Sequence, residues 1–201
     1  MLCYSVHMST GKMNVTYNRF AYLARMGEIV FHAADLANLW DIRNPNTLYT
    51  TLKRYVQSGL LFRIRKGMYS IISLEKLDPI LIGIKTIHSY AYISTETVLF
   101  TKGIINQRPG SITIVSAHSI KFEVLFNNYI SRQLNDRFLF NPAGIIKESK
   151  ILTASVERAV ADLLYFNPKT YFDSPEQIDW YKVTEIQKCL GYKELRRGRS
   201  K

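Results

Sequence analysis

Residues 44–71 read NPNTLYTTLKRYVQSGLLFRIRKGMYSI and contain the local signals of a helix followed by a β-hairpin. Asn44 is a favourable N-cap, Pro45 suits the first helical position, and Gly59 is a typical residue just past a helix end. The segments on either side of the RKG tripeptide at residues 65–67 are rich in β-forming residues. The stretch therefore predicts a helix of about three and a half turns that leads into a short hairpin with a basic tip.

One side of this predicted helix is apolar, and the opposite side is polar without any carboxylate. At 100° per residue, an apolar stripe forms that we expect to pack on the preceding helices. The stripe consists of Leu48, Leu52, Tyr55 and Val56. The polar side could simply face solvent without binding anything. Exposed helices, however, usually mix positive and negative charges, which this side does not.

The residue types on the polar side are those that recognise DNA. Asn and Gln can form paired hydrogen bonds with adenine, and Arg and Lys can do so with guanine. Because the N-terminal part of a recognition helix contacts bases, we expect Asn46 and Thr50 to read bases, and the positions further along to hold phosphates. The predicted DNA-binding residues of the helix are Asn46, Thr47, Thr50, Lys53, Arg54 and Gln57.

The hairpin offers a second set of contacts to DNA. Arg63 and Arg65 are two positions apart and share one face of a strand, and Lys66 lies at the tip. Gly67 permits the positive φ of a tight turn. We expect Arg63, Arg65 and Lys66 to bind backbone phosphates, which supply affinity and register rather than sequence preference. A loop that only increases solubility is the alternative.

The residues before this stretch complete a recognisable order of elements. Residues 15–26 have helical apolar spacing and are followed by Gly27, residues 29–31 are extended, and residues 33–40 form a short helix. Helix, short strand, short helix, longer helix and hairpin is the order of a winged helix-turn-helix. We therefore predict such a DNA-binding domain over residues 15–75.

The remainder of the chain predicts a mixed sheet-and-helix domain over residues 76–192, so that the fold class is α+β. Ser94 is the expected cap of a short helix there. A basic tail over residues 193–201 follows. Expected helices cover residues 79–87, 94–103, 154–166 and 180–190, and expected strands cover residues 111–116, 120–126, 129–134 and 144–148.

Positive charge is concentrated at the two ends of the chain. The formal net charge is +11 over 201 residues. Residues 1–88 hold 11 Lys and Arg against 5 Asp and Glu, residues 89–192 hold 11 against 10, and residues 193–201 hold 5 against 1. An excess of positive charge favours phosphate-rich partners, so the distribution assigns double-stranded DNA to the N-terminal domain.

Composition also indicates a cytoplasmic protein. The two cysteines, Cys3 and Cys189, form no disulfide framework, which is typical of a reducing compartment. No apolar run is long enough for a membrane span, and the first ten residues do not have the pattern of a signal peptide. Met1, Met8 and Met13 are equal candidates for the true start.

The sequence does not predict an enzyme, a metal site or a cofactor. The four histidines are scattered, and no phosphate-binding Gly-rich loop or nucleophile elbow is present. A nuclease centre built from Glu123, Asp136 and Glu148 is one alternative, and would require these carboxylates to converge. A ligand-sensing regulator is another, and would require a deep apolar pocket in the second domain.

The segment SVERAVAD at residues 155–162 is the sharpest feature of the second half. Arg158 and Asp162 are four residues apart, so they can pair along one helix. Glu157 lies beside them. We interpret Glu157, Arg158 and Asp162 as a structural motif that attaches the helix to the sheet.

Together, these segments resemble AbiEi-type antitoxins, which are bacterial transcriptional regulators of bicistronic abortive-infection toxin–antitoxin systems. The resemblance spans residues 15–192 and rests on a winged helix with RKGMY at residues 65–69, on YISTETVLFTKGII at residues 92–105, and on ASVERAVADLLY at residues 154–165. The matching positions are Arg65, Lys66, Gly67 and Tyr69 of the hairpin, and Glu157, Arg158, Ala159 and Asp162 of the later helix.

The resemblance implies a DNA-binding domain followed by an antitoxin domain. The first would bind inverted repeats in its own promoter and repress the operon, as a monomer or weak dimer. The second would counteract a nucleotidyltransferase toxin encoded alongside, without a need for stable contact with that toxin.

Overall fold

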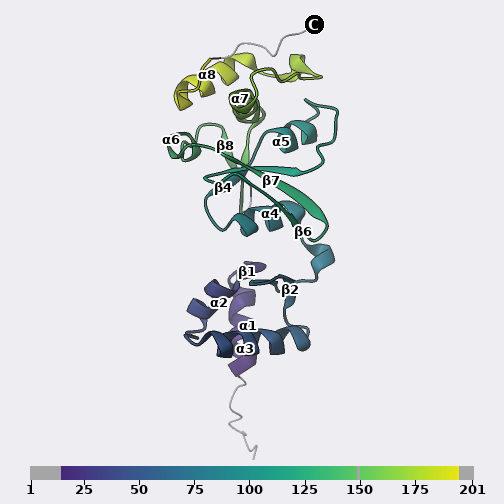
Figure 1. Ribbon diagram of the computed structural model, residues 1–201, viewed down its shortest axis with the longest axis vertical. Coiled ribbons are helices and arrows are strands. Elements are labelled where there is room, and N and C mark those ends of the chain that lie inside the picture. Colours follow the sequence, from purple (N-terminus) through teal and green to yellow (C-terminus); the bar gives the residue numbers. More distant parts are fainter. Residues whose placement is uncertain (1–14, 149, 195–201) are drawn as a thin grey trace, which may run out of the picture. The chain divides into compact units, whose positions relative to one another are not determined.

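The computed structural model describes residues 15–148 and 150–194 of the chain (Figure 1). They belong to two compact units, the first ending at Lys76 and the second beginning at Leu77. The start-codon candidates, Cys3 and residues 195–201 of the predicted tail lie outside the described residues. None of the described helices is long and apolar enough to cross a membrane.

The first unit combines three helices with a small antiparallel sheet. Its strands have the order β1-β3-β2, so that β3 is central. A 3₁₀ turn at Leu74–Lys76 ends the unit. In chain order the elements are α1 (Val15–Arg25), β1 (Val30–His32), α2 (Ala33–Leu39), α3 (Pro45–Gln57), β2 (Phe62–Arg65) and β3 (Met68–Ser70).

The core of this unit forms where the three helices meet the sheet. Leu23 of α1, Leu36 of α2 and Leu52 of α3 have no exposed surface. Trp40 stacks on Tyr55 with their ring centroids 5.3 Å apart. The apolar stripe predicted for α3 is therefore the side that holds this helix against α1 and α2.

The second unit contains a six-stranded mixed sheet with the order β6-β7-β5-β4-β9-β8. The pairs β4–β9 and β5–β7 are parallel, and the other neighbours are antiparallel. Its elements are α4 (Pro79–Ile87), β4 (Ala91–Ile93), α5 (Glu96–Thr101), β5 (Ile112–Ser116), β6 (Ile120–Val124), β7 (Asn127–Gln133), α6 (Asp136–Leu139), β8 (Ile145–Glu148), β9 (Ile151–Ala154), α7 (Val156–Phe166), the 3₁₀ turn Pro175–Gln177 and α8 (Trp180–Leu190).

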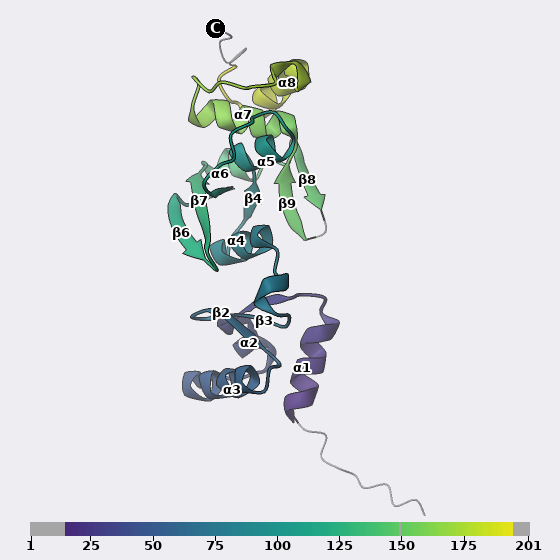
Figure 2. The same cartoon turned by 90° about the vertical axis from the view of Figure 1, so that its right-hand side faces the viewer.

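Helices cover both faces of this sheet (Figures 1 and 2). Helix α4 lies on one face, α5 and α7 lie on the other, and α8 packs on the outside of α7. A Cβ atom at Gly83 of α4 would come within 2.6 Å of the Tyr129 ring on β7. Glycine at this position therefore allows α4 to approach the sheet closely.

The α+β class predicted from the sequence is confirmed, and several elements depart from expectation. Strands β4 and β9 and the short helix α6 were not predicted. The expected cap Ser94 is wrong, because Thr95 occupies the N-cap of α5 and forms no side-chain capping bond. The hydroxyl of Ser94 instead donates to the buried carboxylate of Asp162 at 2.8 Å.

Candidate nucleic-acid interface

Helix α3 is built by the local signals at its two ends. The side chain of Asn44 accepts hydrogen bonds from the backbone N–H groups of Asn46 (2.9 Å) and Thr47 (3.4 Å). Pro45 occupies the first turn, where its missing N–H costs nothing. The helix then runs to Gln57, with Leu48, Leu52 and Tyr55 buried.

The outward side of α3 and the β2–β3 hairpin carry all the predicted DNA-binding side chains. Each of these nine side chains is exposed, and α3 contains no Asp or Glu. A carboxylate-free helix face beside basic hairpin residues favours a polyanionic partner, because nothing on it repels phosphate. The nine residues are Asn46, Thr47, Thr50, Lys53, Arg54, Gln57, Arg63, Arg65 and Lys66.

The hairpin is short and firmly anchored. Gly67 has φ of +78°, and its carbonyl oxygen accepts a hydrogen bond from the N–H of Ala33 at 2.8 Å, which ties the turn to the start of α2. The register of β2 on β3 shifts between Arg63, which faces Tyr69, and Arg65, which faces Met68. Both arginines are exposed on either side of the buried Ile64, as alternation along a strand requires.

Tyr69 on β3 is affected by charged or titratable side chains of both α3 and β2. Burial raises the pKa of the Tyr69 phenol; the charge of Arg63 on β2 opposes this rise, and Tyr49 on α3 adds to it. Tyr49 and Arg63 thus both lie within electrostatic range of one side chain on β3. Tyr49 on α3 and Arg63 on β2 are both exposed, so each element presents at least one exposed side chain near Tyr69.

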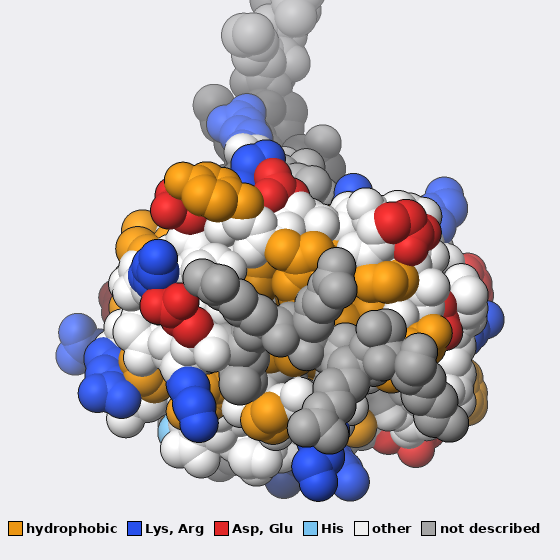
Figure 3. All heavy atoms as spheres, turned by 90° about the horizontal axis from the view of Figure 1, so that it is seen from above, with side chains coloured by type: hydrophobic (Ala, Val, Ile, Leu, Met, Phe, Trp, Pro, Cys, Tyr) orange, Lys and Arg blue, Asp and Glu red, His pale blue; other side chains and the backbone are white. Residues whose placement is uncertain are grey.

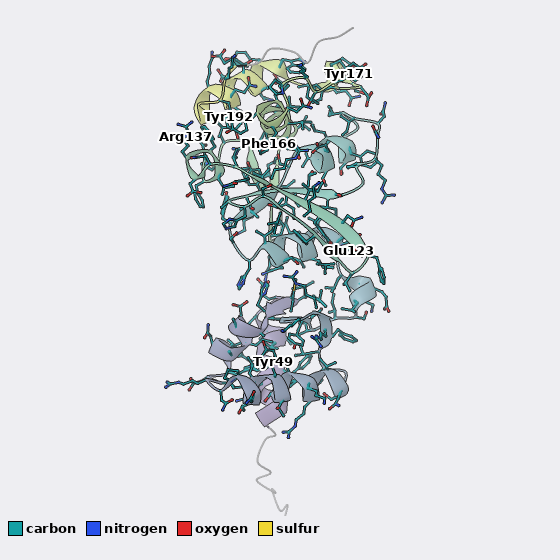
Figure 4. The ribbon with its side chains drawn as sticks, viewed as in Figure 1. Tyr49, Glu123, Arg137, Phe166, Tyr171 and Tyr192 are labelled. Atoms are coloured by element: carbon teal, nitrogen blue, oxygen red, sulfur yellow. The ribbon has the colours of Figure 1, made fainter. Side chains whose placement is uncertain are left out.

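Two exposed residues, one on α3 and one in the turn before it, were not among the DNA-binding residues predicted from the sequence. Tyr49 of α3 is 47% exposed (Figure 4). Arg43 lies just before the N-cap, with a side chain that is 94% exposed and 3.7 Å from Asp41. The helical projection places Tyr49 beside the apolar stripe, so it was not counted with the polar face. Arg43 lies outside the helix, in the turn between α2 and α3.

The second unit encloses a polar cluster around the paired residues Arg158 and Asp162. Neither side chain has exposed surface, and Arg158 Nε donates to Asp162 Oδ1 at 2.9 Å. This confirms the pairing along α7. The other four N–H groups of Arg158 donate to the Tyr92 hydroxyl (2.6 Å) and to the carbonyl oxygens of Phe138 (3.2 Å), Asn141 (3.1 Å) and Ala143 (2.9 Å).

Both carboxylate oxygens of Asp162 accept hydrogen bonds from several side chains. Its Oδ1 atom also accepts from the Tyr192 hydroxyl at 2.9 Å, and its Oδ2 atom accepts from Tyr92 at 3.0 Å as well as from Ser94. Burial, followed by the charge of Asp162, raises the pKa of both phenols far above the ordinary value, so Tyr92 and Tyr192 stay protonated as donors. The cluster is saturated with hydrogen bonds and closed to solvent, so it has no free group that could bind a substrate.

The strands that carry two of the acidic residues considered for a nuclease lie far apart. Glu123 lies on β6 and Glu148 ends β8, and these strands form opposite edges of the six-stranded sheet. At about 4.8 Å per strand, five intervals separate them by roughly 24 Å. Within residues 15–148 and 150–194, no group of three His, Cys, Asp or Glu residues could hold a metal ion.

Two depressions on the second unit are open, and their linings mix polar and apolar side chains. One of about 660 Å³ is lined by Glu96, Arg108, Arg132 and Lys169, among others. Another, of about 610 Å³, adjoins it at Arg108 and is lined by Phe100 and Asn128, among others. On the face shown in Figure 3, acidic and basic side chains are interspersed. Neither depression is the deep apolar pocket expected of a ligand sensor.

The described residues form a mixed α+β fold. Its first unit exposes the polar face of α3, which has no carboxylate, and the basic side chains of the β2–β3 hairpin. No protein-family model matches the chain, and no curated protein matches it. Among solved structures, the crystal structure of the RV2827C protein from Mycobacterium tuberculosis is similar, with a TM-score of 0.52 at 12% sequence identity. The match covers 87% of this chain and 71% of that one. At this identity, the similarity shows the fold alone.

Proposed function

We propose that the first unit is a winged helix-turn-helix that binds double-stranded DNA. In this proposal α2 and α3 form the helix-turn-helix, α3 enters the major groove, and the β2–β3 hairpin is the wing. The observation that carries the proposal is the carboxylate-free exposed face of α3, together with the exposed side chains of Arg63, Arg65 and Lys66 in the same unit. Asn46 and Thr50 near the N-terminus of α3 read bases, and the basic side chains hold phosphates.

We further propose that the protein is a cytoplasmic transcriptional repressor and the antitoxin of an AbiE-like system. The support for this part is the resemblance of residues 65–69, 92–105 and 154–165 to AbiEi-type antitoxins. The protein would bind inverted repeats in its own promoter, and residues 77–194 would counteract a nucleotidyltransferase toxin. A reading frame for such a toxin next to the gene is the first observation to seek.

The DNA-binding proposal is tested by fluorescence anisotropy with labelled DNA from the region upstream of the gene. Asn46→Ala should cost about 1–3 kcal/mol and relax preference at one base pair, because it removes a base contact. Lys53→Ala should weaken binding to all DNA sequences alike, and should reduce the salt dependence of binding by about one phosphate contact. Lys102→Ala, an exposed change in the second unit, is the matched control. Unchanged affinity of an Asn46→Ala/Lys53→Ala double variant would exclude α3 from the interface.

A further inference from the structure

Strand β6 forms one edge of the six-stranded sheet and pairs only with β7 among the described strands (Figure 2). An edge strand presents a row of backbone N–H and C=O groups that can pair with another strand. Its sequence, Ile-Lys-Phe-Glu-Val over Ile120–Val124, places a Lys and a Glu symmetrically about the central Phe122.

The turn between β6 and β7 determines which backbone groups point outward. Leu125 and Phe126 both have positive φ, at 48° and 63°, and Val124 pairs with Asn127 across them. This is a two-residue turn of the type in which both central residues have positive φ. The pair that closes such a turn exchanges hydrogen bonds, and hydrogen-bonded pairs then alternate along the strands.

Counting from that turn, the residues of β6 divide into two sets. Ile120, Phe122 and Val124 direct their backbone groups toward β7. Lys121 and Glu123 direct theirs away from the sheet, and their side chains are exposed (Glu123 is labelled in Figure 4). The outward N–H and C=O groups of the edge therefore belong to the two charged residues.

Two copies of β6 can pair antiparallel about a two-fold axis through Phe122. This register places Lys121 of each copy opposite Glu123 of the other, so that the opposite charges meet twice. The same two residues carry the outward backbone groups, and each Lys–Glu pair can exchange both N–H···O=C bonds. The register that the charges require is thus also the one that the backbone allows.

The apolar face of β6 fits the same register. Phe122 stacks on Tyr129 with ring centroids 4.9 Å apart and would meet Phe122 of the second copy. Ile120, which is 43% exposed, would lie opposite Val124 of the second copy. Phe126, which is 96% exposed, would lie at the same end of the paired strands as Ile120 of the second copy.

The edge strand β2 of the first unit provides a useful contrast. Its exposed side chains are Arg63 and Arg65, and it contains no acid. Two copies of β2 would bring like charges together, which destabilises strand pairing. Self-complementary charge therefore distinguishes β6 from β2.

We propose that the protein forms a symmetric dimer in which β6 pairs with β6 of a second copy, joining the two six-stranded sheets. The Lys121–Glu123 pairs set the register. An interface of this kind is isologous and closes at two subunits. The proposal does not depend on DNA binding, although a two-fold symmetric dimer would match an inverted repeat.

The test is sedimentation velocity of the full chain without DNA over a concentration series. Wild-type protein should dimerise reversibly. Lys121→Glu or Glu123→Lys alone should raise the dissociation constant about tenfold or more, because each change makes both symmetric pairs repulsive. The double variant Lys121→Glu/Glu123→Lys restores opposite charges and should return the dissociation constant to near the wild-type value.

Two controls separate this interface from general effects of charge. Lys102→Glu reverses an exposed charge elsewhere on the second unit and should leave the dissociation constant unchanged. Circular dichroism should show the same folded spectrum for every variant, since both changed side chains are exposed. A wild-type protein that remains monomeric throughout the series, or a dimer that is indifferent to the single reversals, would overturn the proposal.

Discussion

Arg158 shows how a buried charge can be retained in a protein interior. Its five N–H groups all have acceptors on surrounding elements, so the guanidinium loses its water without losing hydrogen bonds. A buried pair of this kind adds little net stability compared with well-packed apolar residues, but removing one partner is costly. Arg158 therefore links α7 to β4 and to the segment between α6 and β8.

Replacing Arg158 with Met should destabilise the second unit by about 3–5 kcal/mol, because Asp162 would be left buried without its cation. The matched control is Arg137→Met in the same unit, where an exposed guanidinium lies 4.2 Å from the Phe138 ring centroid (Figure 4). That control should cost about 1 kcal/mol or less. Urea unfolding followed by circular dichroism gives both values. Equal losses for the two variants would contradict the structural role of the cluster.

Tyr129 should make stability depend on alkaline pH. Burial, and then the charge of Asp78, raises the pKa of Tyr129 to about 12, whereas an unfolded tyrosine titrates near about 10. Above the lower value the unfolded chain releases this proton while the folded chain keeps it. The unfolded state then binds fewer protons, so the free energy of unfolding falls as pH rises.

At neutral pH, a Tyr129→Phe variant should be about 1 kcal/mol less stable than wild type, because the 2.9 Å hydrogen bond from the Tyr129 hydroxyl to the Pro79 carbonyl is lost. When pH rises from 9 to 11, however, the free energy of unfolding should fall less for the variant than for wild type. Urea unfolding at each pH measures both differences. Tyr181→Phe changes a tyrosine that is 74% exposed and serves as the control. Some alkaline slope should persist, since the pKa values of Tyr92 and Tyr192 are also raised. An identical slope in wild type and Tyr129→Phe would contradict the assignment.

At the scale of elements, the proposed role of the β2–β3 hairpin in DNA binding differs from that of α3. The turn that carries its exposed charges is tied to α2 through the Gly67 carbonyl, so the charges are held in place relative to that helix. In the proposed complexes, charges held in this way would contact the same phosphates each time. They should contribute affinity without sequence preference.

Replacing Arg63, Arg65 and Lys66 together with alanine should lower the slope of log affinity against log salt by about 2–3 units, at about 0.9 per phosphate contact. Anisotropy titrations across a salt series, on both the promoter DNA and a scrambled sequence, measure this change. Alanine at the exposed Lys102, Lys147 and Lys188 of the second unit removes the same charge and should leave most of the slope intact. Equal effects of the two triple variants would show that only net charge matters.

At the scale of the whole molecule, charge follows the division of the chain into two compact units, which lies between Lys76 and Leu77. Residues 1–76 hold 10 Lys and Arg against 4 Asp and Glu, whereas residues 77–192 hold 12 against 11 and are nearly neutral. DNA binding and protection from a toxin should therefore be separable functions of one chain.

The full-length Asn46→Ala/Lys53→Ala variant should lose promoter binding but still protect cells that express the neighbouring toxin. The wild-type and variant proteins should each be expressed from the same constitutive promoter, and the toxin from an inducible one, so that lost repression does not alter the dose. Growth after toxin induction measures protection, and a reporter fused to the upstream region measures repression. Loss of protection together with repression would show that the two functions are not separable.

Local signals in the sequence determined much of the first unit. The bounds of α3, the hairpin turn at Gly67 and the exposed position of the nine polar side chains all depend on caps, turn residues and periodicity within a few positions. The helix at residues 79–87 and the Arg158–Asp162 pair along α7 were predictable for the same reason. Interactions between residues three or four apart can be deduced directly from spacing.

Only the tertiary structure decided what depends on distant parts of the chain. Strands β4 and β9 are short apolar segments without alternation, and they become strands because a sheet surrounds them. The buried carboxylate of Asp162 accepts hydrogen bonds from Tyr92, Ser94 and Tyr192, which are 70, 68 and 30 residues away in the sequence. Ser94 donates its hydroxyl to this carboxylate and does not cap α5. The order of strands likewise places Glu123 and Glu148 at opposite edges. Sequence spacing alone cannot specify such arrangements, because the free energy that selects them comes from burial and pairing between segments that meet only in the folded chain.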